Sequence, residues 1–221
     1  MKILDVAQFW SPLSGGVKRY VEDKMAHFAG RDDVAHAVIV PSHRDAVQHP
    51  WETRLYEVKS PRLLGSQSYR MLCSRKRIGE ILRQERPDVV EVGDPYLAAW
   101  AAWREADALG IPVVAFYHSD YPRALGRTVR RFGGACCEAL LDRSVAPYLR
   151  ALYNRMEATV VASARILGLL DEIGIEHLAH IPLGTNTRVF RPYPSRETLR
   201  ARLALRPNEA LLVFAGRLAR E

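Results

Sequence analysis

The sequence predicts an α/β protein built around a doubly wound parallel sheet. Short apolar runs alternate with helix-length segments along the chain, and three of the runs end in glycine or polar residues. Strands of a parallel sheet are buried on both faces and therefore appear as continuous apolar runs. Alternation of such strands with helices is typical of a sheet that carries helices on both sides. The chain has 221 residues and a hydrophobic content of 48%, which suffices for a full core.

Seven strands are expected where runs of apolar residues are bounded by polar residues or glycine. They cover Lys2 to Ala7, His36 to Val40, Arg54 to Val58, Asp88 to Val92, Pro112 to Tyr117, Thr159 to Ala162 and Leu178 to Leu183. The carboxyl ends of parallel strands meet at one edge of the sheet, where ligands bind. Residues 14–16, 93–94 and 118–120 follow three of these strands and should converge at that edge.

Helices are expected between the strands. They cover Gly16 to Ala29, Ser68 to Glu85, Tyr96 to Leu109, parts of Arg123 to Met156, and Ala164 to Glu172. In the first of them Val17, Val21, Met25 and Phe28 are spaced to form one apolar stripe, which is the face that packs on a sheet.

The composition changes near the end of the first domain. From Pro182 to Pro194 proline, glycine, asparagine and threonine dominate, which indicates a linker, and Ser195 then caps a short helix. The run Leu211 to Ala215 reads as a new buried strand. We therefore expect a first domain over residues 1–184, a linker over 185–208 and the first strand and loop of a second domain over 209–221. Because one strand cannot form a sheet, the chain reads as the front portion of a longer protein.

Targeting signals and cysteine frameworks are not evident. No charged and apolar leader precedes the first strand, and no apolar stretch approaches the roughly 20 residues of a membrane span. Three cysteines, of which Cys136 and Cys137 are adjacent, give neither a disulfide framework nor a metal-ligand spacing. These features favour a reducing, cytoplasmic location.

The net charge of +7 is concentrated in two stretches, Arg62 to Arg86 and Arg123 to Arg155. Each holds seven basic residues against two acidic ones. Such stretches can meet the phosphates of a nucleotide or an anionic membrane surface, or they can be solvated helix faces. No helix-turn-helix, zinc-finger or aromatic RNA-binding pattern is present, so a nucleic-acid partner is not expected.

Two strand ends carry candidate binding side chains. His118 follows the strand Pro112 to Tyr117, and an imidazole can donate or accept a hydrogen bond near neutral pH. Asp94 follows the neighbouring strand and can bind a hydroxyl group or cap the helix that begins at Pro95. Asp120 can likewise cap a helix after Pro122. For His118 the alternative is a polar residue that merely ends a strand.

Gly15 and Gly16 open the first helix, where backbone amides and the positive helix end suit a phosphate. The alternative is a plain tight turn. The chain has no Gly-x-Gly-x-x-Gly and no Walker ending, so dinucleotide oxidoreductase and phosphoryl-transfer functions are not favoured. It also has no Asp-x-Asp pair, so we expect no metal and no cofactor.

Five segments in order resemble landmarks of the family 4 retaining glycosyltransferases. They are Gly15-Gly16-Val17, residues 87–95, residues 110–118, residues 182–187 with Phe190, and Gly216-Arg217-Leu218. Each segment alone is common in α/β proteins. The occurrence of all five in the family's order, across nearly the whole chain, is specific for the family.

The resemblance implies a GT-B architecture, in which two Rossmann-like domains face a cleft. The first domain mainly holds the acceptor and the second the nucleotide sugar, and this chain would supply the first domain and the start of the second. His118 would be catalytic and contact the donor hexose. The resemblance also assigns donor binding to Gly15, Gly16 and Arg217, and acceptor binding to Asp94, Tyr117, Ser119 and Asp120. The lysine that commonly pairs with the arginine and the Glu-x7-Glu element would lie beyond Glu221.

The resemblance implies transfer of a hexose from a nucleotide diphosphate sugar, GDP-mannose or a UDP-hexose, to a lipid or saccharide acceptor with retention of configuration. Without a metal, Arg217 and helix-terminal amides would stabilise the leaving diphosphate. The segment Tyr117 to Pro122 looks most like the mannosyltransferase branch, whereas Asn186 and Glu91 depart from the family pattern. Little activity is expected of the chain alone. The alternative function is a non-catalytic module that binds an acceptor or the inner membrane surface.

Overall fold

The structure is a computed structural model of the chain, and it describes residues 1–11, 15–63, 69–118, 121, 144–192 and 196–214. The chain divides into two compact units, Met1–Pro182 and Leu183–Glu221. The first unit contains the sheet and the candidate site.

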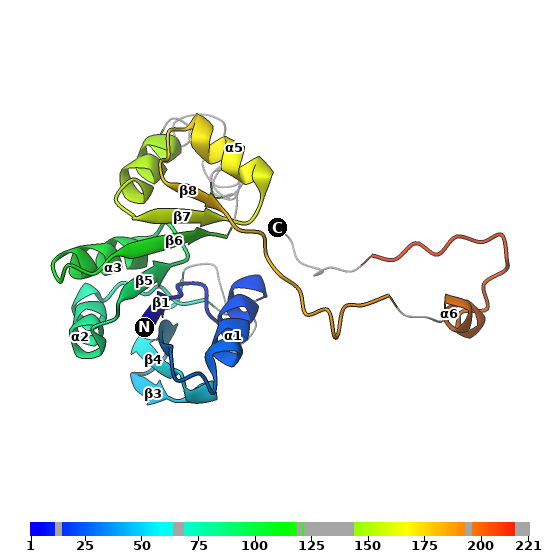
Figure 1. The fold of residues 1–221 in the computed structure, drawn as a ribbon, viewed down its shortest axis with the longest axis horizontal. Helices are drawn as coiled ribbons and strands as arrows, with labels where there is room; N and C mark the ends of the chain where they lie inside the picture. Colours follow the sequence, from blue (N-terminus) through cyan, green and yellow to red (C-terminus); the bar gives the residue numbers. More distant parts are fainter. Residues whose placement is uncertain (12–14, 64–68, 119–120, 122–143, 193–195, 215–221) are drawn as a thin grey trace. The chain divides into compact units, whose positions relative to one another are not determined.

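The first unit is built on an eight-stranded sheet in the order β3-β4-β2-β1-β5-β6-β7-β8 (Figure 1). Its strands are β1 (Lys2–Val6), β2 (Ala35–Ser42), β3 (Ala46–Gln48), β4 (Arg54–Lys59), β5 (Val89–Val92), β6 (Val113–Tyr117), β7 (Ala158–Val161) and β8 (Leu178–His180). All neighbouring strands are parallel except β3 and β4, which pair antiparallel. All seven strands expected in the first domain form.

Helices pack on both faces of this sheet. They are α1 (Gly16–Phe28), the short 3₁₀ helix η1 (Pro50–Glu52), α2 (Arg75–Glu85), α3 (Leu97–Asp107), a helix over residues 144–153, and α5 (Ala164–Glu172). Met25 of α1 packs with Val38 of β2 in one cluster. Leu82 of α2 and Ala102 of α3 pack with Val90 of β5 in another. The predicted doubly wound α/β fold is therefore confirmed.

The strand order reverses between β1 and β5. From β1 the chain continues to β2 on one side, whereas from β5 it continues to β6 on the other. Ligands of doubly wound sheets bind beyond the carboxyl ends of the strands at such a switch point. The loops that follow β1 and β5 are thus the expected place for a ligand.

Three elements differ from the sequence expectation. The helix expected from Ser68 begins at Arg75, because the Ser74 side chain caps it by accepting a hydrogen bond from the Arg77 amide at 3.3 Å. Strand β3 was not expected, since three residues at a sheet edge give no periodic pattern. The last expected strand ends at His180 rather than Leu183.

The second unit contains the expected short helix as α6 (Arg196–Arg202). Residues 211–214, where a buried strand was expected, form no strand, and Leu212, Val213 and Phe214 are 92%, 77% and 82% exposed. A strand needs a neighbouring strand for its backbone hydrogen bonds, and the described residues of this unit supply none.

Candidate active site

His118 follows β6, and its ring lies among three neighbours. The His118 ring centroid is 4.2 Å from that of Phe116 and 5.2 Å from that of Tyr20, both in edge-on geometry. The third neighbour is Gly93 after β5, where a Cβ would lie 3.1 Å from Cδ2 and from Nε2 of His118. The ring forms no hydrogen bond to a described residue. Packing against these three neighbours therefore fixes the position of the imidazole.

The His118 imidazole is neutral at physiological pH. Burial and the ammonium group of Lys24 lower the pKa of His118 to about 4, and Asp5 opposes this shift. A neutral imidazole donates one hydrogen bond and accepts another. That pair suits the hydroxyl groups of a polar, uncharged ligand.

Asp94 lies next to this position, immediately after Gly93. Its side chain is buried, and Oδ1 accepts a hydrogen bond from the Tyr121 hydroxyl at 2.8 Å. The same hydroxyl donates to the Gly93 carbonyl at 2.9 Å. Asp94 Oδ2 is buried and forms no hydrogen bond of normal geometry to the described residues. Burial raises the pKa of Asp94 to about 6, while Tyr121 and the Phe9 backbone act in the opposite direction.

Gly15 and Gly16 are the N-cap and first residue of α1. A Cβ on either glycine would have no described atom within 4 Å. Tyr20, which contacts His118, lies one turn further along α1. The structure therefore brings the amino end of α1, the end of β5 and the end of β6 to the same edge of the sheet, as the sequence predicts.

Tyr117 ends β6 at that edge, but its side chain points into the core. Its side chain is 3% exposed and packs against Tyr121 and Tyr153 at ring-centroid distances of 4.9 and 5.5 Å. Successive residues of a strand point to opposite faces, so Tyr117 points away from the face of Phe116 and His118. Ser119, Asp120 and Arg217, the other predicted contacts, lie outside the described residues.

A buried charge cluster behind His118 was not predicted. Asp5 of β1 and Glu91 of β5 lie side by side in register, and Lys24 of α1 reaches both. Lys24 Nζ lies 2.7 Å from Asp5 Oδ1 and 2.9 Å from Glu91 Oε2. The Tyr20 hydroxyl donates to Glu91 Oε1 at 2.9 Å. The cluster continues from Asp5 Oδ2 to His36 Nε2 at 3.1 Å.

Electrostatics ties the members of this cluster together. Burial lowers the pKa of Lys24, but Asp5 and Glu91 outweigh it, so the pKa is raised and the ammonium form persists. Burial and Asp5 raise the pKa of Glu91. Lys24 and His36 outweigh burial at Asp5 and lower its pKa. Two adjacent carboxylates inside a sheet thus share one ammonium group, which fixes all three side chains.

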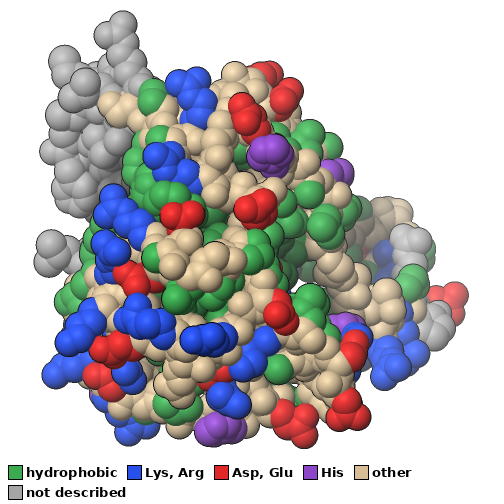
Figure 2. All heavy atoms as spheres, turned by 60° about the vertical axis from the view of Figure 1, so that its left-hand side comes forward, with side chains coloured by type: hydrophobic (Ala, Val, Ile, Leu, Met, Phe, Trp, Pro, Cys, Tyr) green, Lys and Arg blue, Asp and Glu red, His purple; other side chains and the backbone are tan. Residues whose placement is uncertain are grey.

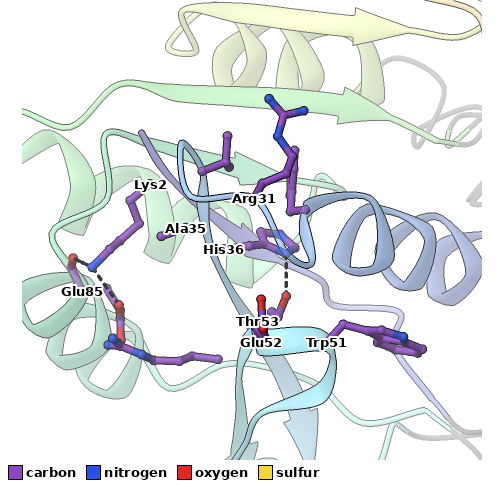
Figure 3. A pocket seen from close by; sticks show the side chains of 11 residues that line it. Lys2, Arg31, Ala35, His36, Trp51, Glu52, Thr53 and Glu85 are labelled. Carbon is purple, nitrogen blue, oxygen red and sulfur yellow. Dashed lines mark hydrogen bonds and ion pairs between the residues drawn. The ribbon is translucent and has the colours of Figure 1, made fainter.

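A cavity of about 220 Å³ lies at the opposite edge of the sheet, where β1, β2 and β4 begin (Figure 3). Lys2, His36, Trp51 and Glu85 are among its lining residues. Lys2 Nζ pairs with Glu85 Oε2 at 3.2 Å, and His36 Nδ1 lies 3.2 Å from Thr53 Oγ1. None of the predicted site residues lines this cavity.

The first basic stretch is partly neutralised by acidic side chains. Arg75 and Arg83 of α2 pair with Glu105 of α3 at 2.6 and 3.1 Å, and Arg77 pairs with Glu80 at 2.9 Å. Figure 2, which brings the α2 and α3 side forward, shows Lys and Arg side chains interspersed with Asp and Glu. Most of the second stretch, from residue 122 to 143, lies outside the described residues.

The part of the chain that the structure describes lacks both a membrane-spanning helix and a group of metal ligands. No helix in this part of the chain is long and apolar enough to cross a bilayer. In the same residues, no three His, Cys, Asp or Glu side chains are grouped to hold a metal ion. The absence of a metal from the site stays a prediction.

Glycosyltransferase Family 4 matches residues 14–189. A GDP-mannose-dependent alpha-mannosyltransferase of Corynebacterium glutamicum is 24% identical over the whole of this chain and 52% of its own length. A protein of the same name from Mycobacterium tuberculosis is 25% identical over the whole chain and 57% of its own length. A GDP-mannose-dependent alpha-(1-6)-phosphatidylinositol dimannoside mannosyltransferase of Mycobacterium tuberculosis is 26% identical over the whole chain and 55% of its length. The chain therefore spans about half the length of the relatives it matches.

Solved structures share the fold. Anabaena HepE in complex with UDP-glucose superposes with a TM-score of 0.55 at 14% identity, over 92% of this chain and 50% of that one. Sucrose-phosphate synthase from Thermosynechococcus elongatus superposes with a TM-score of 0.52 at 13% identity, over 86% of this chain and 92% of that one.

Proposed function

This chain belongs to glycosyltransferase family 4, and we propose that it forms the acceptor-side, Rossmann-like half of a GT-B enzyme. The enzyme moves a hexose from a nucleoside diphosphate sugar to a lipid or saccharide acceptor with retention of configuration. The observation that carries this proposal is His118, a neutral imidazole packed at the end of β6 between Tyr20, Phe116 and Gly93. Such a group can hydrogen-bond a sugar hydroxyl without adding a charge.

GDP-mannose is the first donor to test. Three relatives that match the whole chain are GDP-mannose-dependent mannosyltransferases. A UDP-hexose is the second candidate, because a structure of the same fold was solved with UDP-glucose. Mannose is α-linked in GDP-mannose, so an α-mannoside product means retention.

Each residue has a role in this mechanism. His118 hydrogen-bonds the donor hexose, while Gly15, Gly16 and Arg217 hold the diphosphate. As the bond from the anomeric carbon to the diphosphate breaks, negative charge grows on the phosphate oxygens, and the positive end of α1 and Arg217 stabilise it without a metal. We assign Asp94, Ser119 and Asp120 to the acceptor hydroxyl. Its oxygen bonds to the anomeric carbon as the diphosphate leaves, and its proton passes to the leaving diphosphate. We assign Tyr117 no ligand contact, because its ring packs against Tyr121 and Tyr153 on the face of the strand opposite Phe116.

A lipid acceptor would place the enzyme on the inner membrane surface. One relative's name includes a phosphatidylinositol dimannoside, which supports a glycosylated anionic lipid as the acceptor class. Arg127, Arg130 and Arg131 are the basic residues we assign to that surface, since several members of the first stretch are already paired. Sedimentation with anionic vesicles but not neutral ones, lost when these three arginines are changed to glutamate, supports this assignment. Equal sedimentation with both vesicle types, or with neither, contradicts it.

The reaction itself is tested with the complete protein that the gene encodes. It is incubated with radiolabelled GDP-mannose or UDP-glucose and a lipid and oligosaccharide acceptor mixture, without added metal. Label in an extended lipid or saccharide with an α linkage supports the proposal. Release of free sugar alone, or no turnover of either donor, contradicts it.

A further inference from the structure

Tyr20 of α1 links His118 to the buried charge cluster. Its ring lies 5.2 Å from His118 and 4.9 Å from Phe116, and its hydroxyl bonds Glu91 at 2.9 Å. We propose that Tyr20 is a positioning residue, which holds the His118 imidazole in the orientation that meets the donor sugar, and that Glu91 in turn holds Tyr20. The inference rests on the proposed function, because it concerns the group that acts on the donor.

Among the described residues, the contacts that bound the His118 ring are those with Tyr20, Phe116 and Gly93. Phe116 in β6 and Gly93 after β5 contact the His118 ring from the sheet. Tyr20 reaches the ring from the helix. Without the Tyr20 ring, other side-chain rotamers become open to His118. Catalysis is sensitive to such a change, because misplacing a reacting group by about 1 Å can cost about 100-fold in rate.

Tyr20 itself is held by a chain of short contacts that ends in the sheet. Glu91 Oε1 accepts from the Tyr20 hydroxyl, and Glu91 Oε2 lies 2.9 Å from Lys24 Nζ. Lys24 is bound in turn to Asp5 at 2.7 Å. Asp5 and Glu91 are paired in register on β1 and β5, the two strands at the switch point. Hydrogen bonds between buried, charged groups of this kind rigidify the side chains that take part.

The same helix offers a matched control. Phe28, two turns beyond Tyr20, contacts His36 at a ring-centroid distance of 5.3 Å and an interplanar angle of 71°. The corresponding values for Tyr20 and His118 are 5.2 Å and 70°. His36 lies at the start of β2, at the opposite edge of the sheet from His118. Phe28→Ala therefore removes an equivalent aromatic contact from α1 but leaves the contacts of His118 with Tyr20, Phe116 and Gly93 in place. It reaches the charge cluster only through His36, which bonds Asp5.

The first experiment compares Tyr20→Ala, Tyr20→Phe and Phe28→Ala in the complete protein. Alanine is the best helix former, so α1 persists in the alanine variants. For Tyr20→Ala we expect kcat to fall about 10- to 100-fold, with the donor KM within about twofold, because orientation is lost and not binding. Tyr20→Phe keeps the ring and should recover most of kcat. Phe28→Ala should leave kcat unchanged.

A second readout does not depend on sugar transfer. The titration of His118 is followed by NMR in protein labelled at histidine, with the signal assigned from His118→Gln. Loss of the Tyr20 ring exposes the imidazole, so its pKa should rise from about 4 toward the ordinary value of 6.5 in Tyr20→Ala. In Phe28→Ala the His118 titration should stay as in the wild type.

Substitutions of Glu91 test whether its hydrogen bond holds Tyr20 in place. Glu91→Gln keeps an oxygen that can accept from the Tyr20 hydroxyl, whereas Glu91→Leu removes it. Glu91→Gln also turns an amide NH₂ group toward Lys24 Nζ, which is itself a donor. We therefore expect the kcat of Glu91→Gln to lie between those of the wild type and Glu91→Leu, and Glu91→Leu to resemble Tyr20→Phe. The double variant Tyr20→Phe, Glu91→Leu should be no worse than either single variant, because both remove the same interaction.

The outcomes separate the two proposals. Unchanged kcat together with an unchanged His118 titration in Tyr20→Ala overturns the positioning role. Equal losses in Tyr20→Ala and Phe28→Ala overturn it too, since they would reflect the helix and not the contact. If the wild type transfers no sugar, the proposed function fails, and the NMR titration alone then decides the role of Tyr20.

Discussion

Gly93 and His118 lie so close that a side chain at position 93 would collide with the imidazole. A Cβ there would be 3.1 Å from both Cδ2 and Nε2, closer than ordinary van der Waals contact. The two residues follow β5 and β6, which are neighbours in the sheet. The absence of a side chain at position 93 therefore decides where the His118 ring can lie.

Gly93→Ala should displace the His118 ring by a few tenths of an ångström and lower transfer about 10- to 100-fold, with little change in the unfolding midpoint. Kinetics with the preferred donor and thermal unfolding measure the two effects. Gly168→Ala is the matched control, because a Cβ at that position of α5 meets no described atom within 4 Å. A Gly93→Ala enzyme as fast as Gly168→Ala would show that the ring position does not matter.

His118 should make the protein less stable in acid. Its folded pKa of about 4 lies below the ordinary 6.5, so between these values the unfolded chain binds the proton and the folded chain does not. This contribution is complete above pH 6.5 and is lost as the pH falls, by about 2 kcal/mol at pH 5. Urea unfolding of the wild type and His118→Gln at pH 7.5 and pH 5 measures it. If both proteins lose the same stability, the imidazole is not buried as described.

Asp94→Asn should stabilise the protein while it weakens acceptor binding. The folded pKa of Asp94 is about 6, above the ordinary 3.8, so stability is lost as the pH rises through 6 and the buried carboxylate ionises. Asparagine carries no charge and can still accept from Tyr121. We expect a gain of at most about 3 kcal/mol at pH 8 and none at pH 3.5. Urea unfolding at both pH values and the acceptor KM test this; a loss of stability at pH 8 would argue against it.

Gly15→Ala and Gly16→Ala should weaken donor binding. A Cβ on either residue has no described atom within 4 Å. Gly15 has a φ of −92° and a ψ of −107°, a combination outside the allowed regions of alanine, so Gly15→Ala should also lower stability, whereas Gly16→Ala should not. A methyl group there would instead meet a diphosphate that approaches the backbone amides. We expect the donor KM to rise about tenfold, the scale of one lost hydrogen bond to a charged group, with Gly168→Ala unchanged. Donor KM values equal to that of the wild type would show that the two glycines form a turn and do not contact the donor.

Local patterns predicted most of the fold. Runs such as Val113 to Tyr117 are apolar over their whole length, and glycine or polar residues end them. The start of α2 was missed because Ser74, and not the composition of the preceding segment, decides it. Strand β3 was missed because it exists only through pairing with β4. A strand that depends on its partner leaves little trace in its own sequence.

The candidate site was predicted only where it depends on strand ends. His118, Gly93 and Asp94 follow their strands directly, so their convergence needs only a parallel sheet. The resemblance assigned Tyr117 to acceptor binding, whereas the alternation of the strand turns its side chain to the face opposite Phe116. The cluster of Asp5, Lys24 and Glu91 was not foreseen, because it depends on strand register. Two carboxylates inside otherwise apolar strands were the available signal.

The role of His118 in sugar transfer is decided by comparing transfer from labelled GDP-mannose by the complete wild-type protein and by His118→Ala. The unfolding midpoint of each protein is measured in parallel. We expect an α-linked mannosylated product from the wild type, and transfer at least about 100-fold slower from the variant, with the midpoint at pH 7.5 nearly unchanged. Transfer by His118→Ala within about threefold of the wild-type rate, far from the loss expected for a positioned catalytic contact, would contradict it.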